Sequence, residues 1–170
     1  MARTAPRAAS RTMDGLDVTS ALVSTEWLAA HLNDSGIVLL DATWTMPGAA
    51  PTAAELYARA HIPGARRFDV DRIADHATAL PHMLPTPEEF AAEAGLLGVG
   101  EDDLVVAYDA TGMASAAARC WWTFRVFGHA KVAVLDGGLP KWQAEDRRTA
   151  SGDQPGPVPK SIVVRFLMPL

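Results

Sequence analysis

Three short apolar runs constrain the fold of this chain more than any other feature. They occupy residues 37–41, 104–109 and 132–136, and each ends in an aspartate. An uninterrupted apolar run of this length is typical of a strand that is buried on both faces of a parallel sheet. Segments with helical features lie between the runs. Because strands then alternate with helices, we predict an α/β fold, in which helices cover both faces of a parallel sheet.

Capping residues mark where several of these helices begin and end. Ser24 is suited to accept the free N–H groups of a first turn. Thr86 and Glu89 form the pattern of a capping box, with Pro87 at the first helical position. Gly128 is the expected C-terminal cap of the longest helix. The expected elements are helices starting at Ser24, at 53–59, from Thr86 to about Ala94, at 114–127 and at 139–145, with a short strand at 67–70.

Composition fits one domain and excludes several classes of function. A chain of 170 residues can bury roughly 70% of its unfolded surface, enough for a real core. Its net charge of −5 argues against nucleic acid and anionic membranes as partners, because both need a basic surface. No apolar run approaches the roughly 20 residues of a membrane span. The single cysteine, Cys120, cannot form an internal disulfide, which indicates a reducing compartment, the cytoplasm.

The histidines show no spacing that is typical of a metal site. Neither an HxH nor an HExxH pattern occurs, and one cysteine cannot contribute to a four-ligand cluster of the usual kind. We therefore expect no bound metal. The histidines are His31, His61, His76, His82 and His129.

Composition also divides the chain into a disordered extension, a domain, and a linker with an apolar tail. The extension is rich in arginine, alanine and serine, which is superficially similar to a transit peptide; a start codon set too early, with Met13 as the true start, is the alternative. The linker is rich in proline, glycine and serine. The tail is too short for a domain. We therefore interpret it as a sign that a following domain has been lost, or that the reading frame changes near residue 160. The three parts are residues 1–21, 22–148 and 149–170.

The carboxyl ends of the predicted strands carry the candidate polar groups. Asp41, Asp109 and Asp136 each follow an apolar run, and ligands of parallel sheets bind at this edge. The favoured interpretation of each is nevertheless an aspartate that caps or turns the chain. After Asp109 comes a loop containing Gly112 and then an alanine-rich helix. Such a junction directs several N–H groups to one place, which suits an anion or a thiolate.

Five motifs in order resemble those of a known family. Together they are similar to the first domain of the two-domain rhodanese-type sulfurtransferases, which act on thiosulfate or 3-mercaptopyruvate, over residues 22–148. The motifs are HIPGA at 61–65, LPHMLP at 80–85, YD at 108–109, RCWW at 119–122 followed by FGH at 127–129, and LDGG at 135–138 with Trp142.

The resemblance implies a rhodanese-like parallel sheet and a division of labour between two domains. In the family, a cysteine of the second domain carries sulfur as a persulfide and no organic cofactor is needed. The first domain lacks that cysteine and shapes the cleft between the domains. Here Asp109 stands in the place of the cysteine. A carboxylate cannot carry sulfane sulfur, so we expect no catalytic residue in this chain.

Each candidate site residue has two interpretations. We expect the Asp109 carboxylate to accept the N–H groups of residues 111–114, with a charge facing the cleft as the alternative. Arg119 either lines the cleft or lies on the helix surface with its stem on the core. His61 and His82 either approach the cleft, where a histidine can relay protons, or are loop histidines bonded to the backbone.

Two further kinds of chemistry are disfavoured. Cys120 falls in the middle of a helix, where a cysteine is usually an inert buried residue; an unrelated α/β enzyme that uses it would need an exposed thiol of lowered pKa. A phosphatase of this fold would need a cysteine and an arginine at the two ends of the loop, and this chain has Asp109 and Ser115 there.

We therefore interpret the chain as the N-terminal, non-catalytic domain of a sulfurtransferase, nearly inactive alone. The alternative is a stand-alone pseudo-rhodanese that binds a protein or a small anion. The expected partner is a second rhodanese domain, and the full enzyme would bind a small sulfur-donor anion. The surface facing that domain should be apolar and support self-association. Its expected members are Met46, Leu84, Met113 and Ile162.

Overall fold

The computed structural model describes residues 20–167, and its centre is a five-stranded sheet in which every pairing is parallel. The strand order is β1-β5-β4-β2-β3. Most of the N-terminal extension expected from composition, residues 1–19, lies outside the described residues. The strands are β1 (Leu22–Val23), β2 (Ile37–Asp41), β3 (Arg66–Arg67), β4 (Leu104–Tyr108) and β5 (Val132–Leu135).

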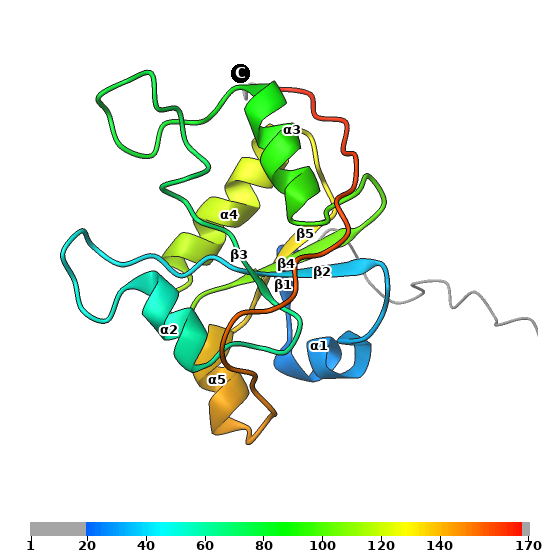
Figure 1. The fold of residues 1–170 in the computed structure, drawn as a ribbon. Helices are drawn as coiled ribbons and strands as arrows, with labels where there is room; N and C mark the ends of the chain where they lie inside the picture. The colour runs from blue at the N-terminus through cyan, green and yellow to red at the C-terminus, as the bar shows by residue number, and fades with distance from the viewer. Residues whose placement is uncertain (1–19, 168–170) are drawn as a thin grey trace, which may run out of the picture.

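Helices cover both faces of the sheet, as the alternation of elements predicts (Figure 1). Side chains of α3 and α4 pack with one set of strand residues, and side chains of α1 and α5 pack with the other. In β4 the two cores receive alternate residues: Val105 and Ala107 face the first, Val106 and Tyr108 the second. The helices are α1 (Thr25–His31), α2 (Ala53–Arg59), α3 (Pro87–Leu96), α4 (Ser115–Val126) and α5 (Gly138–Ala144).

The helix termini follow the local signals closely. The Ser24 side chain accepts the N–H of Trp27, and the capping box of Thr86 and Glu89 is formed. Helix α3 continues two residues past the expected end, to Leu96. A second capping box, of Thr52 and Glu55, begins α2.

Two edge strands differ from the sequence-based expectation. The pairing of β1 with β5 was not expected, because two residues carry too little pattern to read. Strand β3 ends at Arg67 instead of continuing to residue 70. The reason is Asp69, whose carboxylate accepts the N–H groups of Asp71 and Arg72 and so turns the chain away from the sheet.

The segment after α5 packs along the domain without forming a helix or strand. We call residues 149–167 the strap; Figure 1 shows it running from beside α5 to α3. It is fixed near its start by backbone bonds between Ala150 and His61. Further along, the Lys160 ammonium lies 2.7 Å from the nearly buried Asp103 carboxylate, and its N–H bonds to the Gly95 carbonyl. The strap is thus anchored at both ends of its course.

The expected apolar surface is only partly present. Met46 and Met113 are 69% and 78% exposed. Leu84 is half-buried against the core, and Ile162 is 8% exposed, so the expectation for these two was wrong. Ile162 is buried because the strap folds back onto the core beneath α3 and α4. None of the helices within residues 20–167 is both long and apolar enough to cross a bilayer.

Burial of Ile162 makes the strap part of the stability of the domain. Replacing Ile162 by Ala should lower the free energy of unfolding by about 2 kcal/mol or more, because a buried side chain is lost. The matched change in the next residue, Val163→Ala, should lower it by less than about 0.5 kcal/mol, because Val163 is exposed. Urea unfolding of the whole chain measures both; equal effects would show that the strap is not packed as described.

Candidate functional site

Polar side chains at the carboxyl ends of β2 and β4 tie two loops together. Asp41 is buried, and its Oδ1 accepts the N–H and hydroxyl of Thr43 at 2.9 and 2.5 Å. The Thr43 hydroxyl in turn accepts the N–H of Ala110 at 2.9 Å. Burial raises the pKa of Asp41, and the bonds from Thr43 oppose that rise. The loop after β4 is therefore held against the end of β2 by one short chain of hydrogen bonds.

The loop after β4 directs several hydrogen-bond donors at Asp109. We call this cluster of donors, which includes the N–H groups of Thr111, Gly112 and Ala117, the cradle. The Asp109 carboxylate is buried, and Oδ1 accepts the N–H groups of Thr111 and Gly112 at 3.1 and 3.0 Å, and the Thr111 hydroxyl at 2.8 Å. Oδ2 accepts the N–H of Ala117 at 3.4 Å. Donors at 113 and 114 were expected as well, but the Met113 N–H bonds to the Thr111 hydroxyl instead. The cradle is a real cluster of donors, and this carboxylate satisfies it.

A cavity of about 220 Å³ lies beside this loop, at the carboxyl edge of the sheet. It brings together residues of three segments: the loop after β2, the loop after β3 and the first turns of α4. The N-cap residue of α4, Ala114, offers no side-chain acceptor, and in the first turn the Asp109 carboxylate accepts the N–H of Ala117. The lining residues are Trp44, Val70, His82, Ser115, Ala116 and Arg119.

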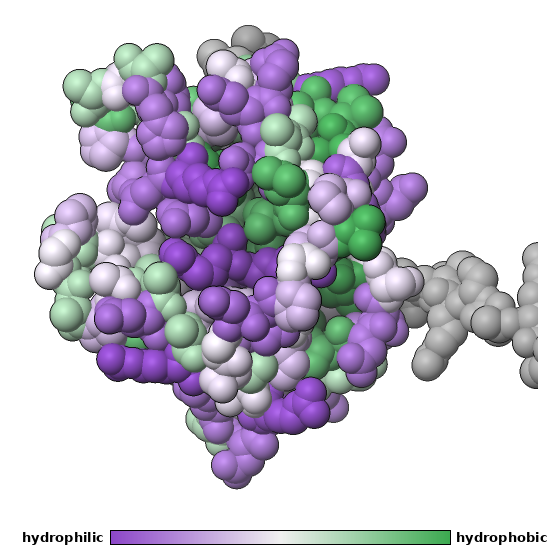
Figure 2. All heavy atoms as spheres, in the orientation of Figure 1, coloured by the Kyte–Doolittle hydropathy of each residue, from purple (hydrophilic) through white to green (hydrophobic). Residues whose placement is uncertain are grey.

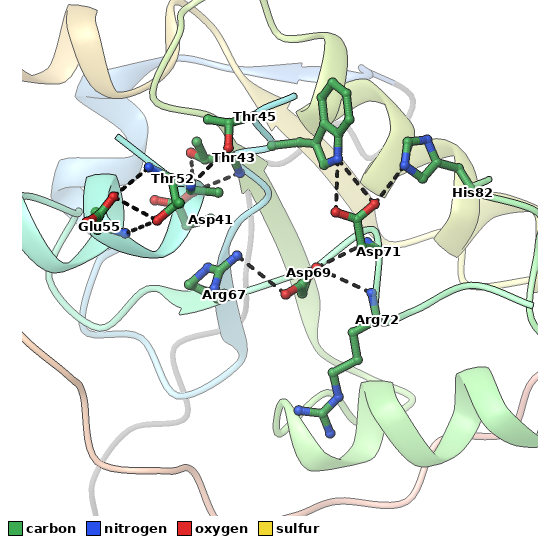
Figure 3. A network of polar contacts seen from close by, with 12 residues as sticks. Asp41, Thr43, Thr45, Thr52, Glu55, Arg67, Asp69, Asp71, Arg72 and His82 are labelled. Carbon is green, nitrogen blue, oxygen red and sulfur yellow. Dashed lines mark hydrogen bonds and ion pairs between the residues drawn. The ribbon is translucent and has the colours of Figure 1, made fainter. Parts of the chain in front are cut away.

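His82 and Trp44 converge on one carboxylate at the rim of this cavity. His82 Nε2 lies 2.7 Å from Asp71 Oδ1 (Figure 3). The Trp44 Nε1–H lies 3.1 and 3.2 Å from the two oxygens of the same carboxylate. The two rings meet edge to face. His82 has a φ of 59°, a left-handed conformation that the surrounding contacts must hold.

Arg119 connects this loop to α4. Its guanidinium donates to the His82 carbonyl and lies 4.8 Å from the centre of the Trp122 ring. Burial lowers the pKa of Arg119. The structure thus brings Arg119 and His82 together, and both line the cavity beside the Asp109 loop.

His61 lies in a different environment. It is fully buried and stacked on Tyr57 at 4.0 Å between ring centres. Nδ1 lies 2.8 Å from the Tyr57 carbonyl and must be the protonated nitrogen, because a carbonyl only accepts. Within the described part of the chain, Nε2 has no hydrogen-bond partner. His61 does not line the cavity.

The remaining candidates have structural surroundings. Cys120 is fully buried in the core, and burial raises the pKa of its thiol well above the ordinary value, so it meets neither requirement for a nucleophile. Asp136 is exposed and pairs with Lys141 at 2.6 Å. Across residues 20–167 no group of three or more potential ligands could hold a metal ion.

Sequence reasoning missed Trp44, Asp71 and Ser115 as members of this site. Trp44 follows the end of β2 by three residues, a position that could have been singled out. Asp71 carries no local signal, because its role depends on contacts with residues 27 and 11 positions away.

Comparisons with known proteins match most of the described domain. Residues 24–145 match the family model described as a rhodanese-like domain. The chain is 50% identical over 141 residues to thiosulfate/3-mercaptopyruvate sulfurtransferase 1, mitochondrial, of Arabidopsis thaliana, covering 81% of this chain and 37% of that protein. It is 43% identical over 129 residues to 3-mercaptopyruvate sulfurtransferase of Escherichia coli, covering 75% and 46%.

Solved structures show the same likeness. SseA from Escherichia coli, described as a 3-mercaptopyruvate sulfotransferase with the rhodanese fold, superposes with a TM-score of 0.80 at 38% identity, over 87% of this chain and 56% of that chain. Tum1 from Saccharomyces cerevisiae superposes with a TM-score of 0.72 at 32% identity, over 84% and 48%. The chain spans less than half the length of the sulfurtransferases of Arabidopsis thaliana and Escherichia coli compared by sequence above.

The role of Asp109 as an acceptor can be tested by a matched pair of substitutions. Asp109→Ala should lower the free energy of unfolding by about 2 kcal/mol, because the buried N–H of Ala117 and the partly buried N–H groups of Thr111 and Gly112 lose a charged acceptor. Asp109→Asn should lower it by less than about 1 kcal/mol, because one acceptor oxygen remains. Urea unfolding measures stability, and hydrogen exchange at Thr111 and Gly112 measures the loop; equal losses would contradict this role.

Proposed function

The chain belongs to the family of rhodanese-like domains, and from this membership we propose that it forms the non-catalytic half of a sulfurtransferase cleft. The complete enzyme would move sulfur from thiosulfate or 3-mercaptopyruvate to a thiophilic acceptor through a cysteine persulfide. A second rhodanese-like domain, on whichever chain carries it, would supply that cysteine. This half would contribute the N-terminal domain, as the order of its motifs suggests.

One observation carries the proposal: the cradle after β4 holds a carboxylate instead of a thiol. A persulfide requires a nucleophilic sulfur that the donor can reach. Asp109 has none, and the only cysteine, Cys120, is enclosed by the core. A domain with an intact cradle and no accessible thiol is suited to shaping a cleft.

The cavity supplies groups that suit an anionic sulfur donor. Arg119 carries a permanent positive charge at the cavity wall, and Ser115 and Ala116 at the start of α4 line the same space. His82 is held in place by Asp71 and by Arg119. We propose that these groups attract and orient the donor, while sulfur transfer occurs on the other domain.

The rim of the cavity suits contact with a second domain. Large apolar side chains that lie close to the lining residues in the sequence are exposed, as expected of a surface that another domain covers. In the separate chain the same rim would favour association between copies. These exposed side chains, each within three positions of a lining residue in the sequence, are Met46, Met83, Met113 and Trp122.

Cys120 provides a direct test of the chain alone. Purified protein should show no turnover above background in a cyanide–thiosulfate assay, and Cys120→Ser should change nothing. The folded chain should also leave the thiol reagent DTNB unreacted until denaturant exposes Cys120. Ordinary turnover that Cys120→Ser abolishes would overturn the proposal.

A chimera tests the proposed partnership. The stretch of Escherichia coli 3-mercaptopyruvate sulfurtransferase that this chain matches would be replaced by residues 20–167. The chimera should transfer sulfur faster than the remaining part of that enzyme alone. Arg119→Gln should lower the activity of the chimera about tenfold or more, because a charged contact to an anion is worth roughly 1.5–3 kcal/mol.

The matched control lies on the same helix. Arg125 packs over Trp121, away from the cavity lining, so Arg125→Gln should leave the activity near that of the parent chimera. A folded chimera no faster than the remaining part alone would contradict the proposal. Equal losses from the two arginine substitutions would contradict the role of Arg119.

A further inference from the structure

A second cleft gathers two arginines that the proposed function does not use. It has a volume of about 340 Å³, within the range of small-molecule sites. It lies between α2, β3 and the strap, and shares no lining residue with the cavity beside Asp109. On the face of the molecule drawn in Figure 2, hydrophilic residues gather near the centre. The lining includes Arg66, Arg67, Leu97, Asp153 and Pro157.

Arg66 is a partly buried charge without a carboxylate partner. Its Nη1 donates to the Leu97 carbonyl at 2.9 Å, and burial lowers its pKa. Within residues 20–167 no carboxylate lies within ion-pair distance of its guanidinium. Removing a charge from water without pairing it is unfavourable. A guanidinium has five N–H donors, so most of those of Arg66 remain for a ligand.

Arg67 adds a second positive charge, and its ion pair with Asp69 is long. Its Nη2 lies 3.5 Å from Asp69 Oδ2, a long contact for an ion pair of this type. Asp153, on the strap, is the one acidic residue among those lining the cleft, and it is exposed. The lining therefore carries a net positive charge, although the chain as a whole is negative.

The roof of the cleft is preformed. Pro157 of the strap packs so closely on Gly98 that a Cβ at Gly98 would lie 2.9 Å from the Pro157 Cβ. The strap is also fixed on both sides, at Ala150 and at Lys160. A ligand would thus enter a cleft whose walls are already in position, which lowers the entropy lost on binding.

We propose that this cleft, whose lining includes Arg66 and Arg67, binds the oxyanion group of a small molecule, a phosphate or a carboxylate. The planar fork of a guanidinium matches both groups, and such charge-assisted bonds are the strongest of their kind. The ligand would supply the negatively charged partner that Arg66 lacks. The site is independent of the proposed function, and its test measures no sulfur transfer.

The test is calorimetric titration of the whole chain at constant ionic strength. Inorganic phosphate and succinate, in separate titrations, distinguish the two sources of the oxyanion. At least one should bind saturably, and Arg67→Gln should weaken that binding about tenfold. Arg67 is the better position to change, because Arg66 also holds the Leu97 carbonyl. The control Arg59→Gln, on the exposed side of α2, should leave affinity unchanged.

A substitution of opposite sign completes the test. Asp153→Asn should tighten binding several-fold, because it removes the one negative charge among the lining residues. Asp34→Asn, at an exposed position outside the cleft, removes the same charge and should have little effect. Unchanged circular dichroism would show that each variant is folded. The proposal is overturned if neither anion binds saturably at millimolar concentration, or if Arg67→Gln and Arg59→Gln act equally.

Discussion

The burial of β2, β4 and β5 between two layers of helices is the constraint on which the rest of the structure depends. All five residues of β4 are buried, so neither face of this strand is open to solvent. Polar groups must then lie where the strands end. Asp41 and Asp109 occupy those ends and bond to the loops that follow. The position of the candidate site is therefore a consequence of the core.

The carboxylates at these ends differ in how well they are satisfied. Asp109 accepts bonds at both oxygens. Asp41 accepts bonds from Thr43 at Oδ1, whereas its Oδ2 has no hydrogen-bond partner in the described residues. Burial raises the pKa of Asp41 because it disfavours the charged form, and the bonds from Thr43 offset only part of that rise. The Thr43 hydroxyl donates to Asp41 and accepts the N–H of Ala110, so it links the two loops. A single buried charge thereby orders two loops of the site.

The features that sequence could predict are those with local causes. Strand β4 follows from a run of apolar residues, and the start of α3 follows from Thr86 and Glu89, three positions apart. The site was less predictable because its contacts are distant in sequence. Trp44 reaches Asp71 across 27 positions, and Lys160 reaches Asp103 across 57. The composition of the strap predicts irregular backbone, but only its contacts show that it is anchored.

The cradle after β4 explains how the domain can keep an ordered loop at this position without a residue that could form a persulfide. Its N–H groups are fixed by the strand, the loop and the start of α4, and a buried donor such as that of Ala117 is costly when unpaired. An apolar replacement for a thiolate would leave them unsatisfied. A carboxylate carries the same negative charge and accepts the same bonds, yet it cannot bond covalently to sulfur in a persulfide. Asp109 thus preserves the electrostatic requirement of the loop and removes its nucleophile, so the loop stays ordered beside the cavity that Arg119 and His82 line.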